Sequence, residues 1–138
     1  MKKLVYIFAA LIFCFAAGSS YAADVKINEF LAHPSSKPTR LNEWIEFYNP
    51  EHIDLSGYFI DDDTDFSNDS GGSKIKKLEG MSSDTDYAVF ENSSSMFNNS
   101  GDNVILFSPE GNIVDQYTYT DDPDDNSIGR SPDATGGF

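Results

Sequence analysis

The segment Asn103–Tyr119, NVILFSPEGNIVDQYTY, has the pattern of a β-hairpin and decides the fold class. Its two ends, Asn103–Phe107 and Ile113–Tyr119, are rich in the β-branched and aromatic residues that favour strands. The residues between them contain a proline, which fixes φ near about −65°, and then Gly111, which can adopt a positive φ. We therefore expect two antiparallel strands joined by a short turn.

More strand-like segments lie upstream, separated by turns rich in glycine, proline, asparagine and aspartate. They are Val25–Ala32, Asn42–Tyr48, Tyr58–Asp61, Lys74–Leu78 and Tyr87–Glu91. Beyond the first residues of the chain no segment keeps a helical period, and helix is expected only as one turn near Ser93–Phe97. About seven short strands of this kind predict an all-β fold, a β-sandwich.

The start of the chain has the pattern of a secretory signal peptide over residues 1–22. Lys2 and Lys3 precede an unbroken apolar run, Leu4–Ala17, and Ser20-Tyr21-Ala22 offers small residues for cleavage before Ala23. The run is shorter than the roughly 20 residues of a membrane-spanning helix. We therefore expect an exported protein, secreted or at the cell surface, with one domain over residues 23–138 and no membrane anchor.

Charge and cysteine content exclude several classes of function. The formal net charge is −14, and without Lys2 and Lys3 the remaining seven basic and 23 acidic residues give −16. Nucleic acid is an unsuitable partner, because phosphate binding needs clustered lysine and arginine. The single cysteine, Cys14, lies inside the signal and follows Phe13, where lipoprotein signals need a small residue. We expect no disulfide, no thiolate chemistry and no lipid anchor.

Six blocks of sequence, in this order and spacing, resemble the lamin tail domain. They are INEF (27–30), EWIEFYN (43–49), DLSGY (54–58), NNSGDNV (98–104), PEGNIVD (109–115) and GRSPD (129–133). The resemblance implies an immunoglobulin-like sandwich of the exported bacterial type, found alone or attached to secreted enzymes. The family usually continues into another extended segment, whereas this sequence ends at Phe138. The resemblance therefore leaves open two expectations, a sandwich without the family's last strand or a truncated reading frame.

The resemblance implies a non-catalytic binding or structural module, with a protein or a cell-surface polymer as its partner. The residues agree, because His33 and His52 fall in loops and no serine lies in a nucleophile elbow. Glu29, Glu43 and Glu46 offer paired carboxylates, but a small sandwich rarely has the deep cleft that glycoside hydrolysis needs. A small hydrolase is the most distant alternative, and we expect no catalytic residues and no enzyme.

Aspartates concentrate after the third predicted strand, where calcium is the candidate ligand. Asp61, Asp63 and Asp65 follow alternate positions and can supply three oxygen ligands to Ca²⁺. This is not an EF-hand, because Phe66 and Gly72 stand where that loop needs glycine and glutamate. The alternatives are a calcium-dependent adhesion module and an acidic loop that is only solvated, the more common case for a charge run.

Aromatic residues offer a second candidate surface. Trp44 and Tyr48 share the strand face opposite Ile45, and Tyr117 and Tyr119 share another. An exposed aromatic stripe on a sheet can bind glycan or protein, whereas a covered one is a second layer of the core. The sequence leaves both alternatives open.

One ion pair is also expected. Alternation places Glu29 on the apolar face of Val25–Ala32, where a carboxylate is costly unless it is paired. Arg130 is one of two arginines in the sequence, and its planar guanidinium can meet a carboxylate at two points. We expect a structural ion pair between Arg130 and Glu29, or failing that Glu43 or Glu46, that holds the C-terminal segment to the sheet.

Overall fold

A computed structural model describes residues 24–35, 42–69, 72–121 and 124–138 of the chain. The predicted signal peptide and its cleavage site lie outside these residues. Within the described part no helix is long and apolar enough to cross a membrane.

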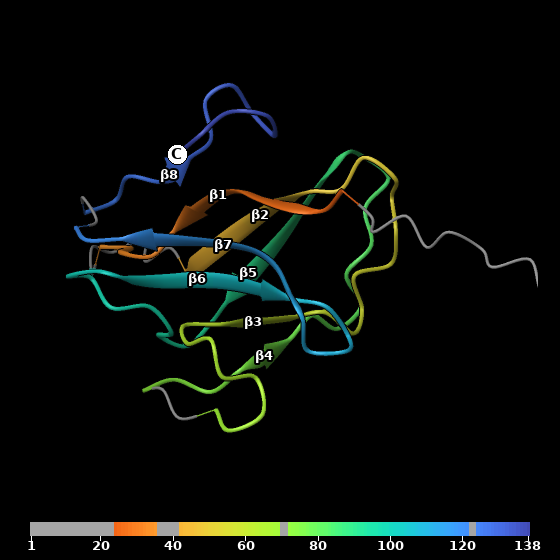
Figure 1. The fold of residues 1–138 in the computed structure, drawn as a ribbon. Helices are drawn as coiled ribbons and strands as arrows, with labels where there is room; N and C mark the ends of the chain where they lie inside the picture. The colour runs from red at the N-terminus through yellow and green to blue at the C-terminus, as the bar shows by residue number, and fades with distance from the viewer. Residues whose placement is uncertain (1–23, 36–41, 70–71, 122–123) are drawn as a thin grey trace, which may run out of the picture.

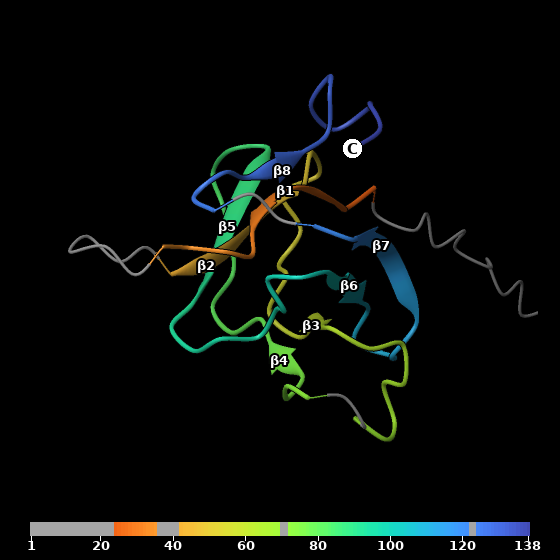
Figure 2. The same ribbon diagram turned by 90° about the vertical axis from the view of Figure 1, so that its left-hand side faces the viewer.

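Eight strands form two antiparallel sheets that pack face to face (Figures 1 and 2). The strands are β1 (Lys26–Leu31), β2 (Glu43–Tyr48), β3 (Phe59–Asp61), β4 (Lys76–Lys77), β5 (Tyr87–Asn92), β6 (Asp102–Phe107), β7 (Ile113–Tyr119) and β8 (Ile128–Gly129). The first sheet has the order β5-β2-β1-β8 and the second the order β4-β3-β6-β7. The predicted all-β sandwich is confirmed, and the hairpin of β6 and β7 has the expected bounds to within one residue.

The core lies between the sheets and is built by alternate residues of the central strands. Ile45 and Phe47 of β2 point inward from the first sheet, and Val104 and Leu106 of β6 point inward from the second. All four side chains are at most 1 % exposed. At about 25 cal/mol per Å² of apolar area removed from water, such burial is the main force that holds the two sheets together.

A β-bulge in β1 changes which residues face the core. The pairing with β2 shifts register between Ile27 and Glu29, so Asn28 is the extra residue. Inward alternation resumes at Phe30, which is fully buried, while Glu29 lies opposite Glu46 on the outer face and is half-buried. The prediction that Glu29 lies on the apolar face is therefore wrong, because strict alternation ends at a bulge.

The helical turn expected near residues 93–97 is also absent. This segment follows β5 as a series of bends, and the backbone N–H groups of Met96 and Phe97 donate to the carboxylate of Glu43 at 2.7 and 3.3 Å. In a helical turn these two N–H groups would donate to backbone carbonyls. Here the carboxylate of Glu43, at the start of β2, accepts from them instead. The segment is fixed by that buried acid, which sequence periodicity does not reveal.

Candidate functional site

The acidic cluster Asp61, Asp62 and Asp63 lies where β3 ends, on the outer face of the second sheet. Asp61 is opposite Ile105 of β6, and Phe59 is opposite Phe107, so these four side chains share the face turned away from the core. They are nevertheless covered, because Asp61, Ile105 and Phe107 are at most 1 % exposed. The cover comes from the residues that follow β3.

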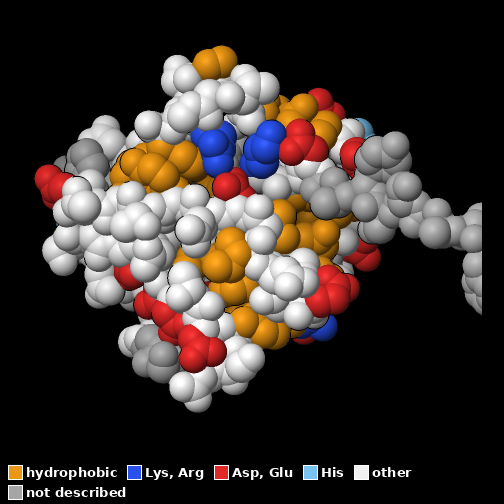
Figure 3. All heavy atoms as spheres, in the orientation of Figure 1, with side chains coloured by type: hydrophobic (Ala, Val, Ile, Leu, Met, Phe, Trp, Pro, Cys, Tyr) orange, Lys and Arg blue, Asp and Glu red, His pale blue; other side chains and the backbone are white. Residues whose placement is uncertain are grey.

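The covering segment, residues 62–69, is called here the acidic loop. Its one aromatic side chain, Phe66, packs on Phe59 and Phe107, with ring centroids 5.1 and 5.3 Å apart. Phe66 also lies against Gly111, where an added Cβ would be 2.5 Å from the ring. Figure 3 shows acidic side chains over the lower part of this side of the molecule. The loop is therefore a docked element that forms a small apolar cluster outside the main core.

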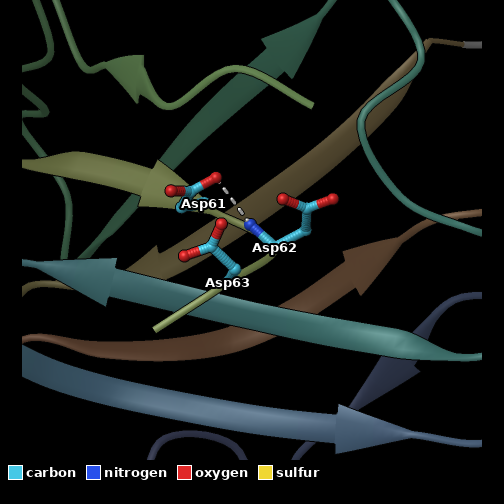
Figure 4. A group of neighbouring side chains, drawn as sticks. All are labelled: Asp61, Asp62 and Asp63. Carbon is cyan, nitrogen blue, oxygen red and sulfur yellow. Dashed lines mark hydrogen bonds between the residues drawn. The ribbon is translucent and has the colours of Figure 1, made fainter. Parts of the chain in front are cut away.

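Figure 4 shows the carboxylates of Asp61 and Asp63 near one another, with the Asp62 side chain extending to the other side of its own backbone nitrogen. Each of the three carboxylates offers one oxygen, and these oxygens are all within 4.8 Å of one another. One oxygen of Asp61 accepts a hydrogen bond from the N–H of Asp62 at 2.9 Å. Oδ2 of Asp61 and Oδ1 of Asp62 are buried and have no hydrogen-bond partner among the described residues. An oxygen of this kind is costly to bury unless a proton or a cation reaches it.

Burial raises the pKa of Asp61 from its ordinary value of 3.8 to about 7, and the charges of Asp63 and Asp62 add to the rise. The N–H of Asp62 acts in the opposite direction, because it favours the ionised form. No lysine, arginine or histidine of the described residues forms an ion pair with Asp61 or Asp62. Asp61 and Asp62 are therefore acidic groups buried without a basic side chain of the described residues beside them.

The set of ligands predicted from the sequence differs from this cluster in one member. The structure brings Asp61 and Asp63 together, but Asp62 takes the place that the prediction gave to Asp65. The Asp65 carboxylate instead accepts from the N–H of Asn68 at 3.1 Å and caps the turn that follows. Alternate spacing assumed an extended chain, whereas the backbone bends directly after Asp61 and allows consecutive residues to converge.

Arg130 has a different partner from the one predicted. Its guanidinium pairs with Asp115 of β7 at 2.8 Å, and it forms no ion pair with Glu29, Glu43 or Glu46. The bulge explains the difference, because it turns Glu29 away from the core, where its carboxylate accepts from Ser127 instead.

The contacts of Arg130 link three parts of the chain. Its Nε donates to the carbonyl of Ile27 at 2.7 Å and its Nη1 to the carbonyl of Gly136 at 3.0 Å. The same Asp115 oxygen that it contacts also accepts from the N–H of Ile27 at 2.9 Å. The guanidinium lies 4.6 Å from the centre of the Phe138 ring. Arg130 therefore joins β1, β7 and the C-terminal segment.

The residues weighed for catalysis do not form one constellation. Glu29 and Glu46 are neighbours across β1 and β2, but Glu43 lies elsewhere and is held by the segment after β5. His52, in the loop after β2, contacts Asp86, just before β5, at 2.9 Å. His33 lies two residues after the end of β1. The described geometry brings no histidine beside a nucleophile and an orienting acid.

The outer face of the first sheet carries the aromatic surface considered from the sequence. Trp44 and Tyr48 of β2 point outward and are half-buried, opposite Glu91 and Tyr87 of β5. The rings of Tyr48 and Tyr87 lie 5.6 Å apart. Val89 of β5 shares this face and is 50 % exposed. We call Trp44, Tyr48, Tyr87 and Val89 the aromatic face.

The other aromatic pair belongs to the core side of the second sheet. Tyr119 is 4 % exposed and Tyr117 packs against the core cluster. Tyr117 stacks on Phe138 at 4.1 Å, and both rings lie near Phe30. The first sheet therefore carries a partly exposed aromatic stripe, whereas the aromatic pair of the second sheet is part of the core.

Comparison with known proteins gives one match. The family model described as Lamin Tail Domain matches residues 18–121, and no curated protein and no solved structure matches the chain. The matched stretch contains five of the six sequence blocks and ends before the block at residues 129–133. It covers most of a chain whose described residues form two four-stranded antiparallel sheets. The chain therefore belongs to the lamin tail domain family, a family of immunoglobulin-like β-sandwiches.

Proposed function

We propose that the protein is an exported, non-catalytic binding module whose aromatic face contacts a protein or a cell-surface polymer. The observation that carries this proposal is the group of half-buried aromatic side chains on the outer face of β2 and β5, beside a half-exposed valine. The inner residues of the same strands already complete the core, so these outer side chains are not needed for it.

Tryptophan and tyrosine are suited to such a surface. They bury a large area at little conformational cost and present a polar group at the rim, which favours interfaces with proteins and with glycans. Val89 and Ile113 are the exposed large hydrophobic residues of the described chain. Val89 shares the outer face of β2 and β5 with Trp44, Tyr48 and Tyr87, whereas Ile113 lies at the start of β7, opposite Phe107. The carboxylates of Glu46 and Glu91 flank these rings and can accept hydrogen bonds from a partner.

The position of β5 supports the same surface. It is an edge strand of the first sheet, so one side of it pairs with no strand among the described residues. An edge of this kind can receive an extended segment of another protein through backbone hydrogen bonds. A protein ligand would then use both the edge of β5 and the aromatic face.

The fluorescence of Trp44 provides a direct test, because it is the sole tryptophan of the sequence. Purified protein is titrated with solubilised surface polysaccharide and, separately, with surface proteins of the producing cells. Binding at the aromatic face changes the emission of Trp44 and protects it from acrylamide quenching. Val89→Lys places a charge in that face and is expected to weaken binding at least tenfold.

Ile113→Lys is the matched control, since it makes the same kind of change at a residue 45 % exposed in the other sheet. Ile113 lines a groove of about 890 Å³ beside the turn between β6 and β7. Unchanged binding in Ile113→Lys together with loss in Val89→Lys supports the aromatic face. Loss in Ile113→Lys alone assigns binding to the groove and contradicts the proposal.

Export rests on the pattern of residues 1–22 and has its own test. Mass spectrometry of protein recovered outside the cytoplasm should find an N-terminus at Ala23 or Asp24 and no lipid on Cys14. A retained signal, or a diacylglycerol adduct on Cys14, would contradict an exported and unanchored module.

A further inference from the structure

The end of β3 holds two buried carboxyl groups, Asp61 and Asp62, that form no ion pair with a basic side chain of the described residues. Asp61 is fully buried and Asp62 is 6 % exposed, and each has a buried oxygen without a hydrogen-bond partner. An ionised carboxylate in such an environment is strongly unfavourable unless it is paired or bound to a metal. Two such residues are adjacent here, and Asp63 adds a third carboxylate.

From this geometry we propose that Asp61, Asp62 and Asp63 bind one calcium ion. The unpartnered buried oxygens are what distinguishes this group from an ordinary acidic loop, whose carboxylates would face water. The proposal concerns the opposite sheet from the aromatic face and does not depend on partner binding there.

The donor set, three carboxylate oxygens on a bent segment, suits Ca²⁺. All three side chains supply oxygen, and the group contains no histidine or cysteine, which zinc prefers. The three oxygens all lie within 4.8 Å of one another, so one ion at the roughly 2.3–2.6 Å typical of calcium can reach all three. Mg²⁺ requires near-ideal octahedral geometry at roughly 2.0–2.1 Å, which consecutive residues on one irregular segment supply poorly.

The bound ion would fix the acidic loop to the second sheet. Asp61 belongs to β3, and the carbonyl of Asp62 accepts from the side chain of Asn103 in β6 at 3.2 Å. A few residues later Phe66 docks on the same face against Phe107. The ion adds to these contacts a link between the strand and the first residues of the loop.

Isothermal titration calorimetry of the chelator-treated protein tests the proposal with CaCl₂ as the probe. We expect one calcium ion per chain, and a melting temperature that rises more with CaCl₂ than with NaCl of equal ionic strength. Ligand binding stabilises the fold by RT ln(1 + [L]/Kd), so the increase should follow the calcium concentration. MgCl₂ should be less effective at the same concentration.

Single substitutions then locate the ion. Asp61→Asn and Asp62→Asn keep the shape of the side chain and should weaken calcium binding at least tenfold. Asp84→Asn makes the same charge change at an exposed position in another loop and should leave the affinity within twofold. Asp65→Asn should also leave it within twofold, because the Asp65 carboxylate caps the turn instead.

Several outcomes would overturn the proposal. One is equal melting curves of the wild-type protein in CaCl₂ and in NaCl of matched ionic strength, a measurement that needs no variant to fold. Another is a loss of affinity in Asp84→Asn as large as in Asp61→Asn, which would show diffuse attraction by the net charge. A loss of calcium affinity in Asp65→Asn with none in Asp62→Asn would show that the ion is bound by Asp61, Asp63 and Asp65, the residues predicted from the sequence.

Discussion

Glu43 and Asp61 are both buried acids at the end of a strand, one in each sheet, but their surroundings differ. The Glu43 carboxylate accepts from the backbone of Met96 and Phe97 and from the side chains of Asn92 and Ser95. Asp61 accepts from the N–H of its neighbour Asp62 and keeps one oxygen without a partner. The described residues thus supply four donors to Glu43 and one to Asp61.

The pKa values express the same contrast. Burial raises the pKa of both residues, but four hydrogen bonds oppose the rise at Glu43, whereas the charges of Asp63 and Asp62 add to it at Asp61. Glu43 is therefore suited to organise the chain around it, which is a structural role. Asp61 is suited to bind something that the chain lacks, a proton or a cation.

The largest effect that we predict is on Glu43. Glu43→Ala removes the acceptor of four donors in a buried region, and unsatisfied buried donors cost ~1–3 kcal/mol each, in part recovered by rearrangement. We expect the free energy of unfolding to fall by about 4 kcal/mol. Urea denaturation followed by circular dichroism measures this loss.

Glu43→Gln is the matched control, because it keeps the size and one acceptor oxygen. It should cost about half as much, since charged acceptors form stronger hydrogen bonds than neutral ones. Equal losses in Glu43→Ala and in an exposed variant such as Glu91→Ala would show that the four hydrogen bonds carry little stability.

A partly buried acid, Asp115, extends the comparison because the chain gives it a cation. Arg130 and Asp115 are 15 % and 18 % exposed and their atoms meet at 2.8 Å. Breaking a buried pair from one side costs ~3–5 kcal/mol, so we expect about 3 kcal/mol for Arg130→Met in this partly buried pair. Chemical denaturation of Arg130→Met, Asp115→Asn and the double variant forms a thermodynamic cycle that isolates the pair.

The sequence-predicted partner serves as the control in that cycle. Glu29→Gln combined with Arg130→Met should give additive losses, because no ion pair joins these residues. A coupling energy larger with Glu29 than with Asp115 would contradict the pairing in the structure.

Much of the sandwich follows from sequence pattern, because the strands are short and alternate strongly. The hairpin of β6 and β7 is one example. Another is β2, where Ile45 faces the core and Trp44 and Tyr48 lie on the opposite face, as expected. The predicted side-chain directions fail where one extra residue interrupts the two-residue alternation of a strand. The bulge at Asn28 carries no glycine or proline to mark it, yet it exchanges the positions of Glu29 and Phe30.

The candidate sites were harder to predict, because their residues meet only after the sheets have paired. Asp115 reaches the N–H of Ile27 across 88 positions of sequence, and no local pattern contains that contact. The residues of the Asp61 cluster are neighbours in sequence, so the concentration of aspartates can be recognised from the sequence. The exchange of Asp65 for Asp62 depends on the direction of the backbone after β3, which charge and spacing do not specify.

The next prediction uses pH to separate the two classes of buried acid. The pKa of Asp61 is about 7 in the fold against an ordinary value of 3.8, so between these values the folded chain holds a proton that the unfolded chain has lost. The stability that this proton provides is complete below the lower value and is lost as pH rises to the higher one. In chelator, the contribution of Asp61 should fall by about 1.4 kcal/mol per pH unit and level off above about 7.

Asp61→Asn removes this titration and isolates it from that of the other acids, including its neighbours Asp62 and Asp63. The free energy of unfolding of wild type and of Asp61→Asn is measured in chelator at pH 5, 6, 7 and 8. As pH rises, wild type should lose stability relative to the variant. A difference that stays constant over this range would show that Asp61 is ionised in the fold throughout.

The smallest effect that we predict is that of NaCl on the free energy of unfolding, which should act on exposed acids and hardly on buried ones. The formal charge of −14 makes the exposed acidic residues repel one another, and raising NaCl from 0.1 to 1 M shortens the Debye length from about 10 to about 3 Å. Weaker repulsion should raise the free energy of unfolding in chelator by up to about 1 kcal/mol, the scale of exposed charge interactions. Buried charges are screened much less, so wild type and Asp61→Asn should gain almost equally from salt. A gain that disappears in Asp61→Asn would place Asp61 in contact with solvent ions and remove the contrast with Glu43.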